Sequence, residues 1–377
     1  MKIFILGTEI AATLNFRGSL IQSLVQKGHM VYVLANDYDV HSKSSVTKMG
    51  AIALESPLNR ASFNPFLDVL GCYRLGKLFK KLKPDAVLNF FTKPVIYGTL
   101  AAKMAKTKNI IAMLEGLGYF FTRRPNPDSL KIKFIRRILV GLYRLSLPYA
   151  NTLILLNQQD VTDLIDHYHI PVKKRIVLGG IGVNLHEFSY QPIRKENPVT
   201  FLFVGRLLFD KGIREFIKAA YLLKKKYPRV VFKIVGDIDP ANPASISQAE
   251  KNKLMTEGMV MLTGFQRNIK DHLAESSVFV LPSYREGVPL SVQEAMAIGR
   301  PVITTRVPGC LDTIIEGESG FFVEPFSAED LVSKMTYFIA HPDQIESMGK
   351  AAHDRADTHF NRIEKDRQLM QLIESCP

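Results

Sequence analysis

Cysteine is scarce in this chain. Its 377 residues contain three, Cys72, Cys310 and Cys376, and none of them lies in a Cys-x-x-Cys pair or at zinc-ligand spacing from a histidine. An odd number of scattered cysteines provides neither a disulfide framework nor a structural zinc site. The composition therefore fits a reducing compartment.

Long hydrophobic runs are also lacking. The apolar run near the N-terminus covers residues 3–6 before Gly7 interrupts it, which is too short for the core of a signal peptide. No uninterrupted apolar stretch elsewhere approaches the ~18 residues of a membrane span. We therefore expect a cytoplasmic protein that reaches a membrane only from its surface.

The second half of the chain has no excess of basic residues. Residues 1–196 contain 27 Lys and Arg against 13 Asp and Glu, whereas residues 197–377 contain 22 against 23. This asymmetry predicts that the first half faces an anionic partner, either phospholipid, nucleic acid or a phosphate-bearing substrate. No nucleic-acid-binding motif accompanies the charge, so a basic nucleic-acid-binding protein is a remote alternative and we expect no nucleic-acid partner.

The hydrophobic pattern indicates two α/β domains. Short apolar strands alternate with amphipathic helices in both halves, and such alternation predicts a parallel sheet covered on both faces. We expect one Rossmann-like domain at residues 1–190, joined by a C-terminal helix at residues 358–377, and a second at residues 198–357. Ligands of such sheets bind at the carboxyl ends of the strands, so we expect the active site in the cleft between the two sheets. Strands are predicted at residues 2–7, 30–35, 86–90, 110–114, 152–156, 175–178, 200–204, 230–235, 259–262, 278–281 and 301–304.

Two cations follow the first strand of the second half. Gly205 and Arg206 come directly after this strand, and Lys211 precedes Gly212, where the next helix begins. A glycine at a strand end lets a ligand approach the backbone, and two cations suit a diphosphate. A solvated turn with surface cations is the alternative interpretation.

A second cluster follows a later strand of the same half. Glu286 lies after the strand end and Gly287 supplies a turn. Pro289 follows, and a helix predicted to begin at Ser291 contains Glu294. N–H groups at a helix start bind phosphate, and carboxylates accept hydrogen bonds from sugar hydroxyls. A capping box of Ser291 and Glu294 would explain only Glu294.

Two further strand ends carry Asp237, after Gly236, and Phe265, after Gly264. We predict that they form the walls of a pocket for a nucleotide base. Each signal is weak by itself, because a glycine after a strand is ordinary turn chemistry.

The string from Glu286 to Glu294 resembles the E-x7-E motif of retaining glycosyltransferases of family 4, and residues 205–212 resemble the phosphate-binding loop of that family. The resemblance implies the GT-B fold, which is an α/β fold of two facing Rossmann-like doubly wound domains, and a UDP-sugar as co-substrate. It assigns the diphosphate to Arg206 and Lys211, the hexose to Glu286 and the ribose to Glu294. The residues it implies are Arg206, Lys211 and Glu286 for catalysis, and Gly205, Asp237, Phe265, Gly287, Val288, Pro289, Leu290, Ser291 and Glu294 for donor binding.

The same resemblance implies a mechanism. Retention is described in this family as front-face attack in which the leaving phosphate deprotonates the acceptor, so we expect no protein nucleophile and no metal cofactor. Asp37-Tyr38-Asp39 and Asp237-Ile238-Asp239 match the D-x-D string that holds a cation in another glycosyltransferase fold. Both follow strands here, and we interpret them as turn residues.

The first domain resembles a narrower group. Residues 59–66 and 115–118 are similar to segments of bacterial enzymes that add N-acetylgalactosamine (GalNAc) to an undecaprenyl-diphosphate-linked amino sugar in O-antigen or other glycan assembly. This implies UDP-GalNAc as donor and a polyprenyl-diphosphate-linked sugar as acceptor. Glu115 lies near a position where many family-4 enzymes have histidine. We predict contacts with the acceptor or sugar from Thr8, Asn15, Arg17, Glu115 and Gly116.

An isomerase on the same architecture, similar to UDP-sugar 2-epimerases, is the nearer alternative. A nicotinamide-dependent oxidoreductase is disfavoured, because Gly7-Thr8-Glu9 follows the first strand in place of a GxGxxG loop.

Two basic segments of the first domain are candidates for membrane binding. The helix predicted at residues 129–147 has cations on one side of a helical wheel and apolar residues on the other, which is typical of helices that lie in a headgroup layer. A buried helix with a solvated basic face would give the same periodicity. The predicted membrane-facing residues, on the inner face of the cell membrane, are Lys77, Lys80, Lys81, Lys133, Arg136, Arg137 and Arg144.

Overall fold

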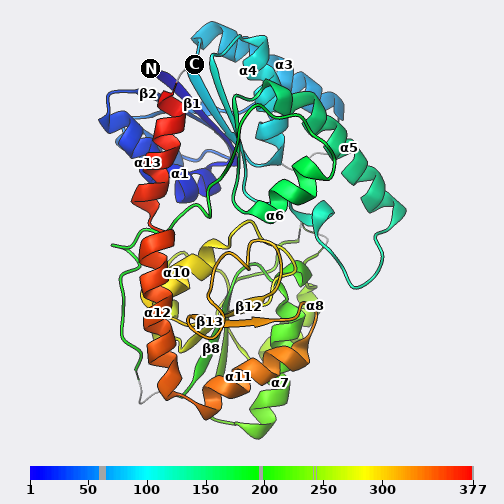
Figure 1. The fold of residues 1–377 in the computed structure, drawn as a ribbon, viewed down its shortest axis with the longest axis vertical. Coiled ribbons are helices and arrows are strands. Elements are labelled where there is room, and N and C mark those ends of the chain that lie inside the picture. The colour runs from blue at the N-terminus through cyan, green and yellow to red at the C-terminus, as the bar shows by residue number, and fades with distance from the viewer. Residues whose placement is uncertain (59–64, 195–197, 241, 243, 376–377) are drawn as a thin grey trace. The chain divides into compact units, whose positions relative to one another are not determined.

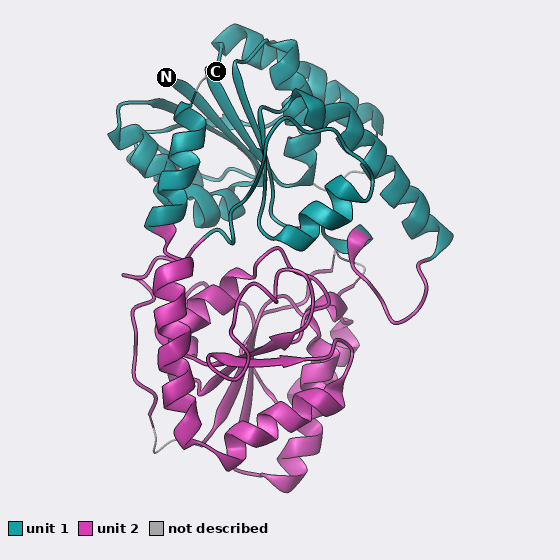
Figure 2. Ribbon diagram, viewed as in Figure 1, with its two compact units in different colours: residues 1–120, 129–181, 363–377 teal, residues 121–128, 182–362 magenta. Residues whose placement is uncertain are grey.

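The computed structural model describes residues 1–58, 65–194, 198–240, 242 and 244–375. The chain divides into two compact units, each with its own parallel sheet (Figure 1, Figure 2). Unit 1 comprises residues 1–120, 129–181 and 363–377, and unit 2 comprises residues 121–128 and 182–362.

The chain crosses between the units at residues 120–121, 128–129, 181–182 and 362–363, and the last two crossings lie side by side. Arg362 Nε donates to the Gly182 carbonyl at 2.8 Å, and Val183 pairs with Asn361 in a parallel bridge. The units therefore divide at residues 181–182 and 362–363, whereas the sequence pattern placed the limits near residues 190–198 and 357–358.

Residues 121–128 lie in unit 2, although the sequence pattern assigned them to the first domain. The Phe121 carbonyl accepts a hydrogen bond from Arg285 Nη1 at 3.3 Å. Burial raises the pKa of Asp210, and the nearby Arg124 guanidinium opposes that rise. Both contacts tie this excursion to loops of unit 2.

The sheet of unit 1 has seven parallel strands in the order β3-β2-β1-β4-β5-β6-β7. Every residue of β4 and β5 is buried, as expected for central strands with helices on both faces. The strands are β1 (Lys2–Glu9), β2 (Met30–Asn36), β3 (Ile52–Glu55), β4 (Ala86–Phe90), β5 (Asn109–Leu114), β6 (Thr152–Leu155) and β7 (Arg175–Val177).

Helix α1 (Ile10–Gln26) follows β1 without a loop, because Glu9 is both the last residue of the strand and the extended N-cap of the helix. The other helical segments of unit 1 are α2 (Val40–Lys48), α3 (Pro65–Leu82), η1 (Pro94–Gly98), α4 (Thr99–Met104), η2 (Tyr119–Phe121, which crosses into unit 2), α5 (Leu130–Ser146), η3 (Leu147–Tyr149), α6 (Gln158–Asp160) and η4 (Val161–Asp166).

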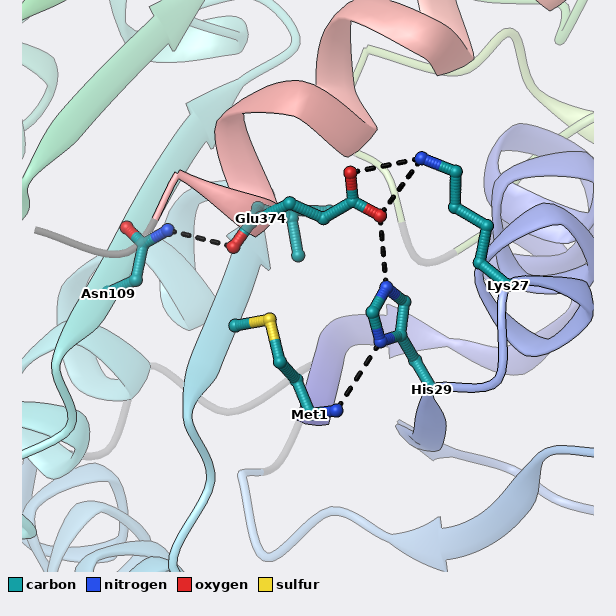
Figure 3. Close-up of polar contacts among 6 residues, drawn as sticks. Met1, Lys27, His29, Asn109 and Glu374 are labelled. Atoms are coloured by element: carbon teal, nitrogen blue, oxygen red, sulfur yellow. Dashed lines mark hydrogen bonds and ion pairs between the residues drawn. The ribbon is translucent and has the colours of Figure 1, made fainter.

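The C-terminal helix α13 (Arg362–Glu374) packs on unit 1, where its last turn is held by polar contacts (Figure 3). The Glu374 carboxylate accepts hydrogen bonds from Lys27 Nζ at 3.0 and 3.1 Å and lies 2.9 Å from His29 Nε2. Asn109 Nδ2 donates to the carbonyls of Leu372 and Ile373 at 2.8 and 3.0 Å. Within the described part of the helix predicted at residues 358–377, α13 begins only after α12 (Asp343–His359) has ended.

The sheet of unit 2 has six parallel strands in the order β10-β9-β8-β11-β12-β13. Its last strand, β13, was not predicted. The strands are β8 (Thr200–Val204), β9 (Val231–Val235), β10 (Met261–Leu262), β11 (Val278–Leu281), β12 (Val302–Thr305) and β13 (Gly320–Val323). The helical segments are η5 (Phe209–Lys211), α7 (Ile213–Lys226), α8 (Gln248–Glu257), α9 (Lys270–Glu275), α10 (Leu290–Ile298), α11 (Ala328–Ala340) and α12.

Each sheet reverses its strand order next to its first strand, between β1 and β4 in unit 1 and between β8 and β11 in unit 2. In open α/β sheets, ligands bind at such switch points, where the loops after the two neighbouring strands diverge. The motif residues of the second half follow β8 and β11, so the fold places them at the switch point of unit 2.

Candidate functional site

The loop after β8 is shaped by a close approach of two backbones. Gly236 has φ +151°, and a Cβ atom there would lie 1.8 Å from the Gly205 carbonyl oxygen. Gly205 itself has φ +157° and donates its N–H to the Val235 carbonyl at 3.0 Å. Only glycine satisfies both requirements at position 236, so the turn that presents Arg206 depends on it.

Arg206 points to a carboxylate of the neighbouring loop. Its Nη1 atom lies 2.7 Å from Asp239 Oδ2, and the Arg206 side chain is 55% exposed. The guanidinium is therefore accessible to a second anion, such as a phosphate. Binding one would require it to share or leave Asp239.

Lys211 and Glu286 form the centre of the site. Lys211 Nζ lies 2.5 Å from Glu286 Oε1, and Ser283 Oγ donates to the same oxygen at 2.6 Å. The Glu286 side chain is 10% exposed and that of Lys211 is 26% exposed. The fold thus brings together a cation from the loop after β8 and a carboxylate from the loop after β11.

Gly212 allows these two loops to meet. It has φ +71° at the N-terminus of α7, and a Cβ atom there would lie 2.0 Å from the Pro282 carbonyl oxygen. The Tyr284 N–H donates to the Asp210 carbonyl at 2.8 Å and fixes the contact. A side chain at position 212 would push Lys211 away from Glu286.

A third segment, missed in the sequence, supports the loop after β11. Gly309 has φ +79°, and a Cβ atom there would lie 2.3 Å from the Glu286 carbonyl oxygen and 2.4 Å from that of Gly287. The Glu286 N–H donates to the Pro308 carbonyl at 3.1 Å, and Thr305 Oγ1 donates to the Ser283 carbonyl. The glycine at position 309 was the available signal, but nothing local linked it to Glu286.

Helix α10 begins at Leu290, with Pro289 as an extended N-cap that makes no side-chain capping bond. Its first N–H groups have no intrahelical partner, which makes the helix start suitable for an anion. Because the helix begins before Ser291, the capping-box interpretation of Ser291 and Glu294 is wrong. Val288 is buried and aligns the turn that starts at Gly287.

Glu294 is the most perturbed carboxylate of the site. Burial raises its pKa to about 8; Arg362 opposes the rise and Glu187 adds to it. The residue is 9% exposed. A buried acid of this kind is suited to hydrogen bonding with ligand hydroxyls.

The predicted base-pocket residues lie after β9 and β10. Asp237 Oδ1 accepts from Lys251 Nζ at 2.5 Å, and this bond is the main reason that the Asp237 pKa is lowered. Phe265 is 72% exposed, which leaves its ring available for stacking. The Gly236 N–H donates to the Gly264 carbonyl at 2.9 Å and keeps these two strand ends together.

The two D-x-D strings are engaged within the protein. Asp237 and Asp239 pair with Lys251 and Arg206, and Asp39 caps α2 by accepting from the Ser42 N–H at 2.6 Å. No cluster of three or more metal-ligating side chains occurs among the residues described here.

Unit 1 places its predicted residues at the carboxyl edge of its own sheet. Thr8 lies in β1, the exposed Asn15 lies in α1, and Glu115 and Gly116 follow β5. Arg17 is different: it is fully buried and its guanidinium binds the Glu115 carboxylate. The prediction that Arg17 contacts the acceptor directly is therefore wrong, because no ligand reaches a side chain with no exposed surface.

The predicted membrane-facing cations lie on α3 and α5. Lys77, Lys80 and Lys81 are exposed on α3, and Lys133, Arg137 and Arg144 are exposed on α5. Arg136 is half-buried and donates from Nε to the Phe120 carbonyl at 2.6 Å. No helix in the described part of the chain has the length and apolar composition of a membrane span.

The α5 face is mixed in character. Leu130, Phe134, Ile138 and Leu145 are 84%, 64%, 46% and 55% exposed, in a stripe beside the cations. The interpretation of α5 as a buried helix with only a basic face is therefore wrong.

Both units are doubly wound, and the switch point of unit 2 carries two cations, two carboxylates and the start of α10. These features define a glycosyltransferase of the GT-B class. Family models agree with this: residues 186–355 match glycosyl transferases group 1, and residues 10–157 match the glycosyl transferase 4-like family. The chain belongs to these glycosyltransferases.

Curated relatives cover most of the chain. It is 28% identical, over 98% of its length and 97% of the relative, to the N,N'-diacetylbacillosaminyl-diphospho-undecaprenol alpha-1,3-N-acetylgalactosaminyltransferase of Campylobacter jejuni. It is 25% identical, over 81% of its length and 79% of the relative, to the UDP-Gal:alpha-D-GlcNAc-diphosphoundecaprenol alpha-1,3-galactosyltransferase of Escherichia coli.

Solved structures share the fold over the full length. Anabaena HepE in complex with UDP and glucose superposes with a TM-score of 0.78 at 17% identity, covering 100% of both chains. Sucrose-phosphate synthase of Thermosynechococcus elongatus gives 0.77 at 20% identity, covering 99% of this chain and 98% of the other. None of these findings supports the epimerase alternative.

Proposed function

We propose that the protein transfers an N-acetylhexosamine, GalNAc in the first instance, from a UDP-sugar to an undecaprenyl-diphosphate-linked amino sugar, with retention of configuration. The observation that carries this proposal is the near full-length similarity to the Campylobacter jejuni enzyme, combined with the Lys211–Glu286 pair at the switch point of unit 2. The Escherichia coli relative is named for a different donor sugar but for the same kind of lipid anchor. The lipid anchor is thus common to the names of both relatives, and the identity of the donor sugar is what must be tested.

The geometry of unit 2 supports specific roles in donor binding. Arg206, Lys211 and the N–H groups at the start of α10 neutralise the leaving diphosphate, while Glu286 accepts hydrogen bonds from the hexose. Glu294 accepts hydrogen bonds from the ribose hydroxyls. Asp237 and Phe265 border the base, and the backbone of residues 287–291 meets the distal phosphate.

Catalysis under this proposal is positioning and charge stabilisation. The bond from the anomeric carbon to the donor phosphate breaks as the acceptor hydroxyl attacks from the same face, and the departing phosphate oxygen takes the hydroxyl proton. Lys211 is placed to stabilise the negative charge that develops on the diphosphate, and its contact with Glu286 couples that charge to the sugar. We infer that neither a protein nucleophile nor a metal cofactor is required.

Unit 1 supplies the acceptor side in this proposal, through Glu115, Gly116, Thr8 and Asn15. We further propose that α3 and α5 bind the inner leaflet of the cell membrane. Exposed cations attract anionic headgroups at about 1 kcal/mol each, and the exposed apolar stripe of α5 inserts beside them. Flotation with anionic liposomes should recover the protein, and equal recovery with neutral liposomes would contradict the charge-based docking.

A substrate panel tests the reaction. The purified protein is incubated with UDP-GalNAc, UDP-GlcNAc, UDP-galactose or UDP-glucose, with and without a prenyl-diphosphate-linked amino sugar, and the product linkage is read by NMR. We expect acceptor-dependent transfer, fastest with UDP-GalNAc, and an α-linked product. A β-linked product would refute retention, and conversion of a UDP-sugar without acceptor would indicate an isomerase.

A further inference from the structure

Arg17 is the largest polar side chain in the interior of unit 1. Its Nη2 atom binds the Glu115 carboxylate and lies 3.0 Å from Met113 Sδ, and its Nη1 donates to the Phe16 carbonyl at 2.8 Å. The guanidinium carbon lies 5.1 Å from the centre of the Phe90 ring. The Arg17 side chain has no exposed surface, and that of Glu115 is 6% exposed.

Stability alone does not explain this ion pair. Removing two charges from water costs several kcal/mol per ion, and buried pairs can often be replaced by apolar residues of similar size without loss. Within the described part of the chain, Arg17 Nε also lacks a hydrogen-bond partner, which adds to the cost. A fully buried arginine that fixes one carboxylate in place therefore points to a function for that carboxylate.

The position of Glu115 indicates which function. It follows β5 directly, next to β4, which borders the switch point of unit 1. Gly116 has φ +116°, so the chain turns away from the sheet immediately after the carboxylate. Glu115 thus lies at the edge of the sheet where ligands bind, and the buried Arg17 contacts it from the interior.

We propose that Arg17 is a positioning residue, which holds the Glu115 carboxylate in one orientation as hydrogen-bond acceptor for a hydroxyl group of a sugar substrate. The inference rests on the proposed function and deepens it, since it assigns substrate recognition in unit 1 to a carboxylate that a buried arginine holds in place. The hydroxyl belongs either to the donor sugar or to the acceptor sugar. A hydroxyl group of either sugar presents the same chemistry, and the kinetics distinguish the two sources.

The experiment is a double-mutant cycle of Arg17→Met, Glu115→Gln and the double variant. We measure kcat and KM separately for the UDP-sugar and for the lipid-linked acceptor, together with the thermal midpoint. Glu115→Gln should lower kcat/KM for one of the two substrates about 10- to 100-fold, as expected for a hydrogen bond to a charged group. The substrate whose constants change identifies the source of the hydroxyl.

Coupling is the decisive outcome. If Arg17 acts through Glu115, Arg17→Met should give a loss similar to that of Glu115→Gln, and the double variant should be no worse than Glu115→Gln. Arg17→Lys should recover part of the activity.

Leu24→Ala is the matched control. Leu24 is fully buried on the same helix, seven residues after Arg17, so its truncation should lower the thermal midpoint without changing kcat/KM per folded molecule. Losses of kcat/KM that multiply in the double variant, or variants that behave like Leu24→Ala, would overturn the inference. Absence of transfer by the wild type with every UDP-sugar would instead refute the proposed function and the inference with it.

Discussion

Replacing Glu294 by glutamine should make the stability of the protein less dependent on pH. Burial raises the pKa of Glu294 to about 8, from 4.5 in the unfolded chain. The folded state therefore keeps the proton over this interval while the unfolded state releases it, so the free energy of unfolding falls as the pH rises from about 4.5 to about 8. Glutamine has nearly the same shape and cannot ionise, so the variant avoids this fall.

The size of the effect follows from the pKa difference. At about 1.4 kcal/mol per pH unit, it gives about 5 kcal/mol as an upper limit above pH 8. Relaxation around the carboxylate reduces such values, and we expect about 2 kcal/mol. For a unit of this size, that corresponds to a rise in thermal midpoint of roughly 4–8 °C for Glu294→Gln relative to wild type.

The assay is thermal unfolding of both proteins between about pH 5 and about pH 9, without substrate. The two midpoints should coincide near pH 5 and separate progressively toward pH 9, because all other titrating groups cancel in the comparison. Glu318→Gln changes an exposed glutamate of the same unit and should follow the wild type throughout. A midpoint difference that stays constant with pH would refute the reasoning, since it would mean that Glu294 does not ionise in this interval.

Three further substitutions test the loops of unit 2. Lys211→Ala should reduce kcat by about two to three orders of magnitude with a smaller change in donor KM, and an unchanged kcat with only a raised KM would contradict a role in the transition state. Asp239→Asn should lower the donor KM several-fold, because Arg206 loses the carboxylate that lies 2.7 Å away and competes with phosphate. Steady-state kinetics at several salt concentrations measure this KM, and a raised KM would contradict the prediction. Gly309→Ala should reduce kcat/KM at least ten-fold by displacing the Glu286 carbonyl, which the added Cβ would approach to 2.3 Å, and full activity would show that the loop yields without cost.

Much of the donor site could be predicted from the sequence because its signals are local. A charged residue or glycine next to an apolar strand marks a loop at the carboxyl edge, and Arg206, Lys211 and Glu286 were found in this way. Glu294 was found in the helix that follows the Glu286 loop. Parallel α/β order then required these loops to meet. The helix start at residue 290 was misjudged by one position, since Pro289 caps it without a side-chain signal.

Contacts between distant segments could not be predicted in this way. Arg17 and Glu115 are 98 residues apart, and their union depends on β1 and β5 both flanking β4. Nothing near Gly309 in the sequence indicated that it supports Glu286. The excursion of residues 121–128 into unit 2 likewise has no local pattern.

The sequence by itself therefore determined the architecture and the chemical types of the residues in the candidate site. Hydrophobic period, turn glycines and charge depend on neighbours within a few positions, and these features specify strands, helices and the loops between them. Only the tertiary structure decided the partners, burial and ionisation of those residues. The order of the strands, and not the local sequence, sets which side chains meet and how much water reaches them. For this reason Arg17 is buried against Glu115, and Glu294 is a neutral acid at pH 7.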